Sequence, residues 1–351
     1  MSTSSLKTAY PVGVIGAGSF GTAIANLLAY NTDVLIYSRK QEVVDAIHRQ
    51  DERHGIILPE RVRGTTDLAT LAEQCHLLFP VVPSDSFRLM MKDLAPHLRP
   101  YHLLIHATKG FDLHGINEEE ITSKGITRAN VCTMSEIIRQ ESVAVRVGCL
   151  SGPNLAKEIL EGQPTATLIA SKFDEVIDVG QSVLSSPLFH VFGSHDLLGA
   201  ELAGALKNVI ALGSGLLKGY GLGKNIQSML ITRGLVEMIY FGRAMGSDVK
   251  AFLGTAGIGD LIATATSKKS RNYTFGFRLG SGESFAEVSA TSDELAEGVR
   301  TLKITRHLAN YYKLRVPITE MLYRIVFEGF PIQDAMDYLM TFPYDIDVDF
   351  L

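Results

Sequence analysis

The stretch VGVIGAGSFGTAIANLLAYN, residues 12–31, decides the fold of the first half of the chain. Its opening VGVIG has the apolar character of a short buried strand, and the residues after the glycines have the apolar spacing of a helix. Between them the glycines follow the pattern Gly16-x-Gly18-x-x-Gly21. A strand, a glycine turn and a helix in this order are typical of a dinucleotide-binding unit, whose turn and helix N-terminus receive a pyrophosphate. A glycine turn that holds no nucleotide is the alternative.

Strands and helices continue to alternate up to about residue 190. Apolar strand-like runs occur at 33–39, 76–84, 102–110, 143–154 and 165–171, and 41–50 has the pattern of a helix. From residue 199 onward the spacing is helical, with two long apolar segments at 199–218 and 225–246. The sequence therefore predicts an α/β fold with a Rossmann-like, doubly wound, mostly parallel sheet over residues 1–194, followed by an all-helical domain over 195–351. Gly193, Ser194 and Asp196 are expected to cap the helix at this boundary.

Length and composition set the broad class. A chain of 351 residues exceeds one comfortable hydrophobic core, which also favours two domains. The net charge of -5 argues against a nucleic acid or an anionic membrane surface as the main partner. There is neither an apolar run of about 18 residues nor a charged and apolar leader, so no membrane insertion or signal peptide is expected. Three scattered cysteines favour reduced thiols in a cytoplasmic protein.

The end of the second strand bears on cofactor choice. An NAD site usually carries an Asp or Glu there for the ribose 2′-hydroxyl, but this chain has Ser38, Arg39 and Lys40. No carboxylate repels a 2′-phosphate, and the Arg39 guanidinium suits one. We expect NAD or NADP as cofactor, with tolerance of or preference for NADP. The alternative is that Arg39 and Lys40 simply begin a solvated helix.

Lys109 lies just after a predicted strand, at the carboxyl edge where ligands bind in open α/β sheets. A surface lysine in a turn is the alternative. His97, His102 and His106 lie close in sequence, but no matching acid or cysteine spacing accompanies them. No metal site is predicted.

Lys207 lies in an apolar helical segment that leaves little polar surface for a charge. Removing an ammonium from water lowers its pKa toward the range of a general acid or base. A buried lysine requires a partner, and Asp260, with Thr264 one helical turn later, is the candidate. A structural lysine paired with Glu201 is the alternative.

The stretch 254–276, GTAGIGDLIATATSKKSRNYTFG, passes from glycines through Asp260 into basic and polar residues. Ser270, Arg271 and Asn272 offer hydrogen-bond donors suited to a small phosphate. A solvated basic loop is the alternative, and it accounts well for the neighbouring Lys268 and Lys269.

Taken together, these motifs resemble the bacterial-type NAD(P)-dependent glycerol-3-phosphate dehydrogenase family. The matching pieces include GAGSFGTAIA, ATKG, SGPN, ALKNVIALGSGL, FLGTAGIGDL, TSKKSRN and EGVRT, in the family's order from residue 13 to about 302. The resemblance implies an oxidoreductase that interconverts sn-glycerol 3-phosphate and dihydroxyacetone phosphate. It also implies a homodimer that supplies glycerol 3-phosphate for phospholipid synthesis.

The resemblance assigns residues as well. Lys207 is the implied proton acceptor in alcohol oxidation, within a catalytic set that also holds Lys109, Asp260 and Thr264. The implied substrate residues are Lys109, Gly152, Asn154, Lys207, Asp260, Ser270, Arg271 and Asn272. The cofactor residues are the turn glycines Gly16, Gly18 and Gly21 with Ser19, Phe20, Arg39, Lys109, Ala156, Arg271, Leu295 and Glu297.

This chain departs from the family pattern at three places. Phe20 stands where many members carry Trp, and Asn154 stands where bacterial members commonly carry Ser or Thr. The acidic, aromatic tail 342–351 has no counterpart.

Two other hypotheses for the function of the chain remain. A β-hydroxyacid dehydrogenase or ketopantoate-type reductase has the same architecture, but the Ser270–Asn272 segment favours a phosphorylated substrate. A non-catalytic NAD(P)-sensing protein would be expected to lack the acid/base lysine, and Lys207 is present.

Overall fold

The computed structural model describes residues 10–292 and 296–343. They form two compact units: one runs up to Asp112 and includes Thr133–Glu201, and the other comprises Leu113–Cys132 and the residues from Leu202 onward. Helix α9 (Leu197–Gly219) begins in the first unit and continues into the second. As expected, Asp196 caps α9, its carboxylate accepting a hydrogen bond from the Gly199 N–H at 2.8 Å. Gly193 and Ser194, which were expected to share this role, are instead the last residues of the strand Phe189–Ser194. The functional division at residue 194 stays a prediction.

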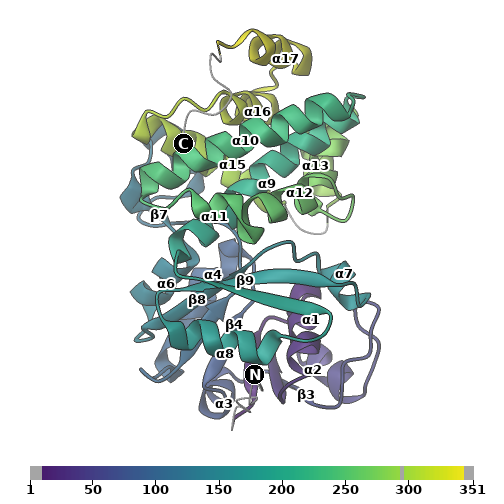
Figure 1. Ribbon diagram of the computed structural model, residues 1–351, viewed down its shortest axis with the longest axis vertical. Helices are drawn as coiled ribbons and strands as arrows, with labels where there is room; N and C mark the ends of the chain where they lie inside the picture. Colours follow the sequence, from purple (N-terminus) through teal and green to yellow (C-terminus); the bar gives the residue numbers. More distant parts are fainter. Residues whose placement is uncertain (1–9, 293–295, 344–351) are drawn as a thin grey trace. The chain divides into compact units, whose positions relative to one another are not determined.

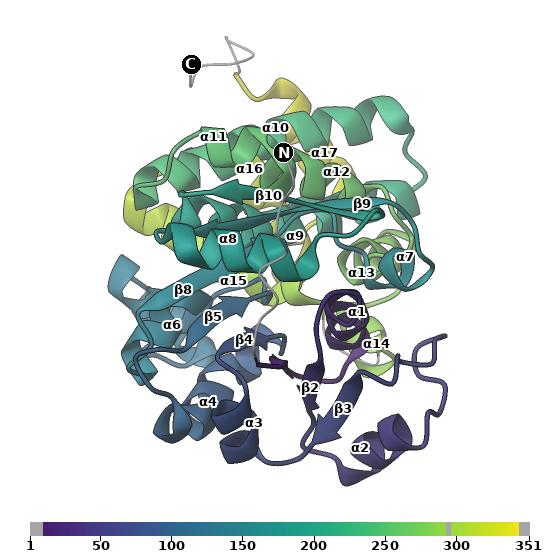
Figure 2. The same ribbon diagram turned by 60° about the horizontal axis from the view of Figure 1, so that its bottom comes forward.

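The first unit is built on an eight-stranded sheet with the order β10-β9-β8-β5-β4-β1-β2-β3 (Figure 2). Every neighbouring pair is parallel except β8 and β9, which are antiparallel. The predicted doubly wound, mostly parallel sheet is therefore confirmed. Its strands are β1 (Val12–Ile15), β2 (Val34–Tyr37), β3 (Val62–Thr65), β4 (Leu77–Pro80), β5 (Leu103–His106), β8 (Arg146–Ser151), β9 (Thr165–Ser171) and β10 (Phe189–Ser194).

Helices cover both faces of this sheet. On one face α1 contacts α7 and α8, and on the other α4 contacts α3 and α6. The apolar side chains of α1 and α8 join those of the central strands in one buried cluster. The helices are α1 (Ser19–Leu28), α2 (Gln41–His48), α3 (Leu68–Gln74), α4 (Ser84–Leu94), α6 (Met134–Glu141), α7 (Ala156–Leu160) and α8 (Asp174–Leu184), with a 3-10 turn at Ala95–His97.

Within this sheet, the sequence pattern missed β3 and β10, which are its two edges. β3 buries only Val62 fully, and the outer half of β10 is largely exposed and contains Gly193. Edge strands with polar and small residues lack the continuous apolar run by which the central strands were recognised.

The second unit is helical, as predicted (Figure 1). The segment Leu113–Cys132 also belongs to this unit. Here β6 (Asp112–Leu113) pairs with β7 (Val131–Cys132), and between them lie α5 (Ile121–Lys124) and 3-10 turns at Glu118–Glu120 and Arg128–Asn130. Besides α9, its helices are α10 (Lys224–Met245), α11 (Lys250–Leu253), a π-helix (Thr255–Gly259), α12 (Asp260–Ala265), α13 (Arg271–Gly280), α14 (Phe285–Ala290), α15 (Glu297–Tyr312), α16 (Pro317–Glu328) and α17 (Ile332–Thr341).

Helix α9 has the length and apolar composition of a membrane span. However, 89% of its apolar window is buried inside the protein. Its hydropathy is therefore explained by its position as the core helix of the second unit.

Glycines allow α9 and α13 to cross at backbone contact. A Cβ atom at Gly276 would lie 1.9 Å from the Leu212 carbonyl oxygen, and one at Gly215 would lie 1.9 Å from that of Tyr273. Gly219 and Gly280 meet the opposite helix in the same way, each at 2.0 Å. No side chain fits in this crossing, so the start of α13 is held at a fixed place along α9.

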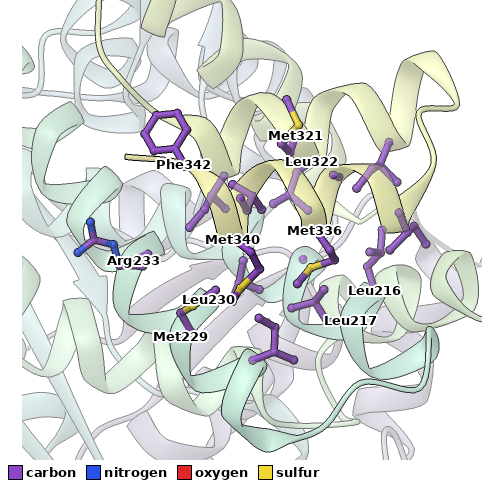
Figure 3. Close-up of a pocket in the computed structure, with 17 residues that line it drawn as sticks. Leu216, Leu217, Met229, Leu230, Arg233, Met321, Leu322, Met336, Met340 and Phe342 are labelled. Carbon is purple, nitrogen blue, oxygen red and sulfur yellow. The ribbon is translucent and has the colours of Figure 1, made fainter. Parts of the chain in front are cut away.

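A cavity of about 430 Å³ lies between α9, α10, α16 and α17 (Figure 3). Its lining is apolar apart from Gly213 and Arg233, and it includes Met229, Met321 and Met336. The Arg233 guanidinium stays protonated, so this cavity offers no group suited to proton transfer.

One buried carboxylate joins α10 to α16. Glu237 accepts hydrogen bonds from the N–H groups of Ile318 (2.6 Å) and Thr319 (3.0 Å) and from the Thr319 hydroxyl (2.7 Å). The two N–H groups belong to the first turn of α16, where backbone N–H groups have no acceptor within the helix. Burial nevertheless dominates and raises the pKa of Glu237 to about 7.

The helix crossing predicts that Gly276→Ala destabilises the second unit, because its methyl group would overlap the backbone of α9. We expect a loss of about 1–3 kcal/mol in the free energy of unfolding, measured by urea denaturation. Gly223→Ala is the control, since a Cβ atom there meets nothing within 4 Å. An unchanged unfolding midpoint for Gly276→Ala would contradict the close crossing.

Glu237 predicts a pH-dependent stability. Because its folded pKa of about 7 exceeds the ordinary value of 4.5, the folded state binds the proton more tightly. This contribution is complete below pH 4.5 and is lost as the pH rises through 7. Between these limits the native chain should lose on the order of 2–3 kcal/mol of unfolding free energy relative to Glu237→Gln. Parallel pH dependences of the two proteins in urea titrations would refute the assignment.

Candidate active site

The second unit buries a lysine beside an acid and a hydroxyl. Lys207 on α9 is 5% exposed, and Asp260 on α12 is 1% exposed. The Lys207 ammonium donates hydrogen bonds to Asp260 Oδ1 and, at 2.6 Å, to Thr264 Oγ1. Thr264 Oγ1 in turn lies 3.2 Å from Asp260 Oδ1. The structure thus brings together three residues that the sequence analysis had grouped as Lys207 and its partners.

The local sequence explains this geometry. The π-helix Thr255–Gly259 ends directly before Asp260, which places the carboxylate in the first turn of α12, where the helix dipole favours a negative charge. Thr264 follows four residues later on the same face of the helix. One face of α12 therefore supplies both partners of the ammonium.

Glu201, the alternative partner of Lys207, has other contacts. Its carboxylate accepts hydrogen bonds from Ser135 N–H (2.7 Å), Ser135 Oγ (2.6 Å) and Thr133 Oγ1 (2.9 Å), and His106 Nε2 lies 3.0 Å away. Burial raises the pKa of Glu201, but the hydrogen bonds from His106 and Ser135 outweigh it and hold this pKa below its usual range. The Glu201 carboxylate is thus satisfied within the first unit.

Asn272, a predicted phosphate donor, makes two hydrogen bonds that the sequence did not reveal. Its amide Nδ2 donates to Asn208 Oδ1 at 2.9 Å, and its Oδ1 accepts the Gly298 N–H at 2.8 Å. A side chain at Gly298 would collide with Asn208, because its Cβ would lie 2.5 Å from the backbone carbonyl oxygen of Asn208. Asn272 therefore ties the start of α15 to α9, beside Lys207. This also gives a reason for Asn208, whose role the sequence alone did not reveal.

The segment Ser270–Asn272 forms the start of α13, not a solvated loop. The buried Ser270 side chain is the N-cap and accepts the Tyr273 N–H at 3.3 Å. Arg271 is exposed at the first position of the helix, and Lys268 and Lys269 are exposed before it. A helix N-terminus with a cation is suited to an anionic group.

In the first unit, the glycine turn has the geometry of a phosphate cradle. Gly16 has φ of 115°, and a Cβ at Gly21 would lie 1.8 Å from the Gly16 carbonyl oxygen. A Cβ at Gly18 would meet nothing within 4 Å, so this side of the turn is open. The N-cap residue of α1 is Gly18, which has no side chain to cap the N–H groups at the start of this helix. These residues therefore fit a dinucleotide cofactor, whose diphosphate such a turn accepts.

Three other predicted cofactor residues, Ser19, Phe20 and Arg39, come after Gly18 in the sequence. Ser19 is exposed, and Phe20 packs partly against the core. Arg39 is exposed two residues after β2, near the strand end where this kind of fold binds the ribose of a dinucleotide.

Lys109 and Gly152 lie together at the carboxyl edge of the sheet. The Lys109 ammonium donates to the Gly152 carbonyl oxygen at 3.0 Å, joining the segments after β5 and β8. The structure thus pairs two residues that only the resemblance had grouped.

Asn154 presents an acceptor, which bears on its departure from the family pattern. Thr167 Oγ1 donates to the Ser151 carbonyl oxygen at 3.1 Å, and so it accepts from Asn154 Nδ2 at 2.8 Å. This fixes the amide orientation and leaves Asn154 Oδ1 buried with no hydrogen-bond partner in the described chain. A ligand hydroxyl would satisfy it.

The remaining predicted residues are Ala156 and Glu297, the first residues of α7 and α15, and Leu295, which lies outside the described residues. Most of the tail 342–351 is likewise outside them. Within residues 10–292 and 296–343, no three His, Cys, Asp or Glu side chains group as metal ligands. His102 instead lies 2.9 Å from the Ala72 carbonyl oxygen.

Sequence reasoning missed one residue at the glycine turn. Arg53, in the segment between α2 and β3, donates from Nη2 to the Ala17 carbonyl oxygen at 3.2 Å. No sequence pattern signals this contact, because it joins residues 36 positions apart through an irregular segment.

Comparisons with known proteins match both parts of the chain to one family. Residues 11–177 match the model of the NAD-dependent glycerol-3-phosphate dehydrogenase N-terminus, and residues 196–337 match that of its C-terminus. The chain is 38% identical to a glycerol-3-phosphate dehydrogenase (NAD(P)+) of Saccharophagus degradans, covering 98% of this chain and 93% of the relative. It is 40% identical to that of Pseudomonas fluorescens, covering 97% of both.

Solved structures agree with this assignment. Glycerol-3-phosphate dehydrogenase from Coxiella burnetii superposes with a TM-score of 0.84 at 29% identity, over 95% of this chain and 99% of that one. A ketopantoate reductase from Ralstonia eutropha, at 16% identity over 94% of this chain and 99% of that one, has a TM-score of 0.56 and shares the fold alone.

Proposed function

The chain belongs to the NAD-dependent glycerol-3-phosphate dehydrogenase family, and we propose that Lys207 is the proton-transfer group of its reaction. The protein is an NAD(P)-dependent oxidoreductase that interconverts sn-glycerol 3-phosphate and dihydroxyacetone phosphate. The observation that carries the proposal for Lys207 is the burial of its ammonium against Asp260 and Thr264.

The proposed chemistry assigns one task to each side chain of this cluster. NAD(P)H, when bound, supplies the hydride that reduces the carbonyl carbon. Lys207 donates a proton to the oxygen of that carbonyl, and in the oxidising direction it accepts the proton of the alcohol. Asp260 and Thr264 fix the ammonium in place, since both contact its nitrogen. Asp260 also keeps the buried positive charge compensated.

Binding of the substrate phosphate is proposed for Arg271 and the start of α13. Arg271 is exposed at that helix start, which supports the proposal, because cations and free N–H groups there attract an anion. Asn272, the next residue of that helix, is also proposed for the substrate phosphate, and its hydrogen bonds to Asn208 and Gly298 hold α15 and α9 together beside it. Lys109, Gly152 and Asn154 are proposed for the polar groups of the three-carbon substrate.

The cellular setting is also proposed. Cys75, Cys132 and Cys149 are buried and form no disulfide, which suits a reducing cytoplasm. A homodimer and a role in supplying glycerol 3-phosphate for phospholipid synthesis follow from family membership alone. Size-exclusion chromatography with light scattering tests the dimer.

Oxidation of NADH or NADPH by dihydroxyacetone phosphate, followed by absorbance, tests the proposed function. Lys207→Met should lower kcat by about 100- to 10,000-fold, because the proton donor is lost while phosphate binding remains. Lys218→Met is the control, as Lys218 is an exposed lysine on the same helix. The double variant Lys207→Met/Asp260→Asn removes the buried charge that Lys207→Met leaves uncompensated, and it should fold but remain inactive. Near-normal turnover in either Lys207 variant would refute the assignment.

Arg39 is proposed to select between the two cofactors. Arg39→Gln should raise KM for NADPH by about 10-fold or more, while KM for NADH changes little, because only NADPH carries a 2′-phosphate. The ratio of kcat/KM for NADPH and NADH is the measurement. A ratio equal to that of the unmodified protein would show that Arg39 merely begins a solvated helix.

A further inference from the structure

The segment between α2 and β3 forms a tight turn that fixes one arginine. His54 and Gly55 both have positive φ, 52° and 88°. On either side of them the Arg53 N–H donates to the Ile56 carbonyl oxygen at 2.7 Å, and the Ile56 N–H donates to that of Arg53 at 3.1 Å. Two residues of positive φ closed by reciprocal hydrogen bonds make a compact hairpin. These two hydrogen bonds therefore fix the backbone of Arg53 within the hairpin.

This hairpin places the Arg53 guanidinium at the glycine turn. Its Nη2 atom donates to the Ala17 carbonyl oxygen at 3.2 Å, and Ala17 lies between Gly16 and Gly18. Burial, and after it the positive charge of Arg53, lower the pKa of the adjacent His54. Because an arginine guanidinium stays protonated, the contact with Ala17 places a permanent positive charge beside the glycine turn.

The guanidinium has hydrogen-bonding capacity left over. Arg53 Nε is buried and has no hydrogen-bond acceptor among the residues that the structure describes. No carboxylate within these same residues forms an ion pair with Arg53. A buried N–H without an acceptor is costly, and a charged donor more so. An anion at the turn would remove this cost.

We propose that Arg53 is a binding residue for the diphosphate of the dinucleotide cofactor. The inference rests on the proposed function and adds a cation to a site otherwise made of backbone N–H groups. The open space at Gly18 and the uncapped start of α1 are where a diphosphate is received in this fold. In a chain of net charge -5, attraction of this anion depends on such local positive charge.

The position of Arg53 also separates its role from that of Arg39. Arg53 contacts the turn after β1, which receives the diphosphate shared by NAD and NADP. Arg39 follows β2, where the ribose 2′ substituent is read. Loss of Arg53 should therefore weaken both cofactors equally, whereas loss of Arg39 should weaken NADPH alone.

Binding titrations of NADH and NADPH, monitored by their own fluorescence without substrate, test the proposal. Arg53→Gln keeps a donor for the Ala17 carbonyl but removes the charge, and it should raise Kd for both cofactors by about 10- to 100-fold. Arg53→Lys should restore part of the affinity. The salt dependence of Kd should also be shallower in Arg53→Gln, because one charge interaction is lost.

Arg49→Gln is the matched control, since Arg49 is an exposed arginine near the same hairpin that pairs with Asp51 at 2.7 Å. Its Kd values should equal those of the unmodified protein. Unchanged Kd values in folded Arg53→Gln would overturn the inference, and a loss confined to NADPH would assign Arg53 to the 2′-phosphate instead. If the unmodified protein bound neither cofactor, the proposed function itself would fail.

Discussion

The burial of one ammonium group constrains much of the second unit. Lys207 is enclosed in a long apolar helix that is mostly buried, and a charge there is tolerated only with a compensating partner. Asp260 and Thr264 provide it, which requires α12 to lie against α9. The start of α13 follows α12 closely and is fixed by the glycine crossing with α9, so the helix start proposed for the substrate phosphate and the ammonium belong to one framework.

The first unit meets a different constraint, the approach of a diphosphate to the backbone. Its glycine turn leaves the space and the N–H groups, but it carries no charge of its own. Arg53 supplies that charge from a hairpin far along the chain, and Arg39 stands after the neighbouring strand. The two arginines divide the cofactor between them: one is assigned to what NAD and NADP share, and the other to what distinguishes them.

Local signals made much of this structure predictable. The strand, glycine turn and helix at residues 12–31 are encoded within 20 residues, and the apolar central strands stand out by composition. The partnership of Lys207 with Asp260 followed from the physical need to compensate a buried charge. Tertiary contacts were not predictable in this way: Arg53 at Ala17, Asn272 between Asn208 and Gly298, and the antiparallel β9 all depend on segments distant in sequence. The edge strands β3 and β10 were not predicted, because half-exposed strands lack a continuous apolar run.

Chemical rescue tests most directly whether the Lys207 ammonium is the proton donor. Lys207→Ala removes the amine and leaves space beside Asp260, which small primary amines added to the solution can enter. We expect such amines to restore dihydroxyacetone phosphate reduction in Lys207→Ala, at rates that follow the pKa of the amine, and to have no effect on the unmodified protein. Turnover of Lys207→Ala that is rapid without any added amine would contradict this role of Lys207.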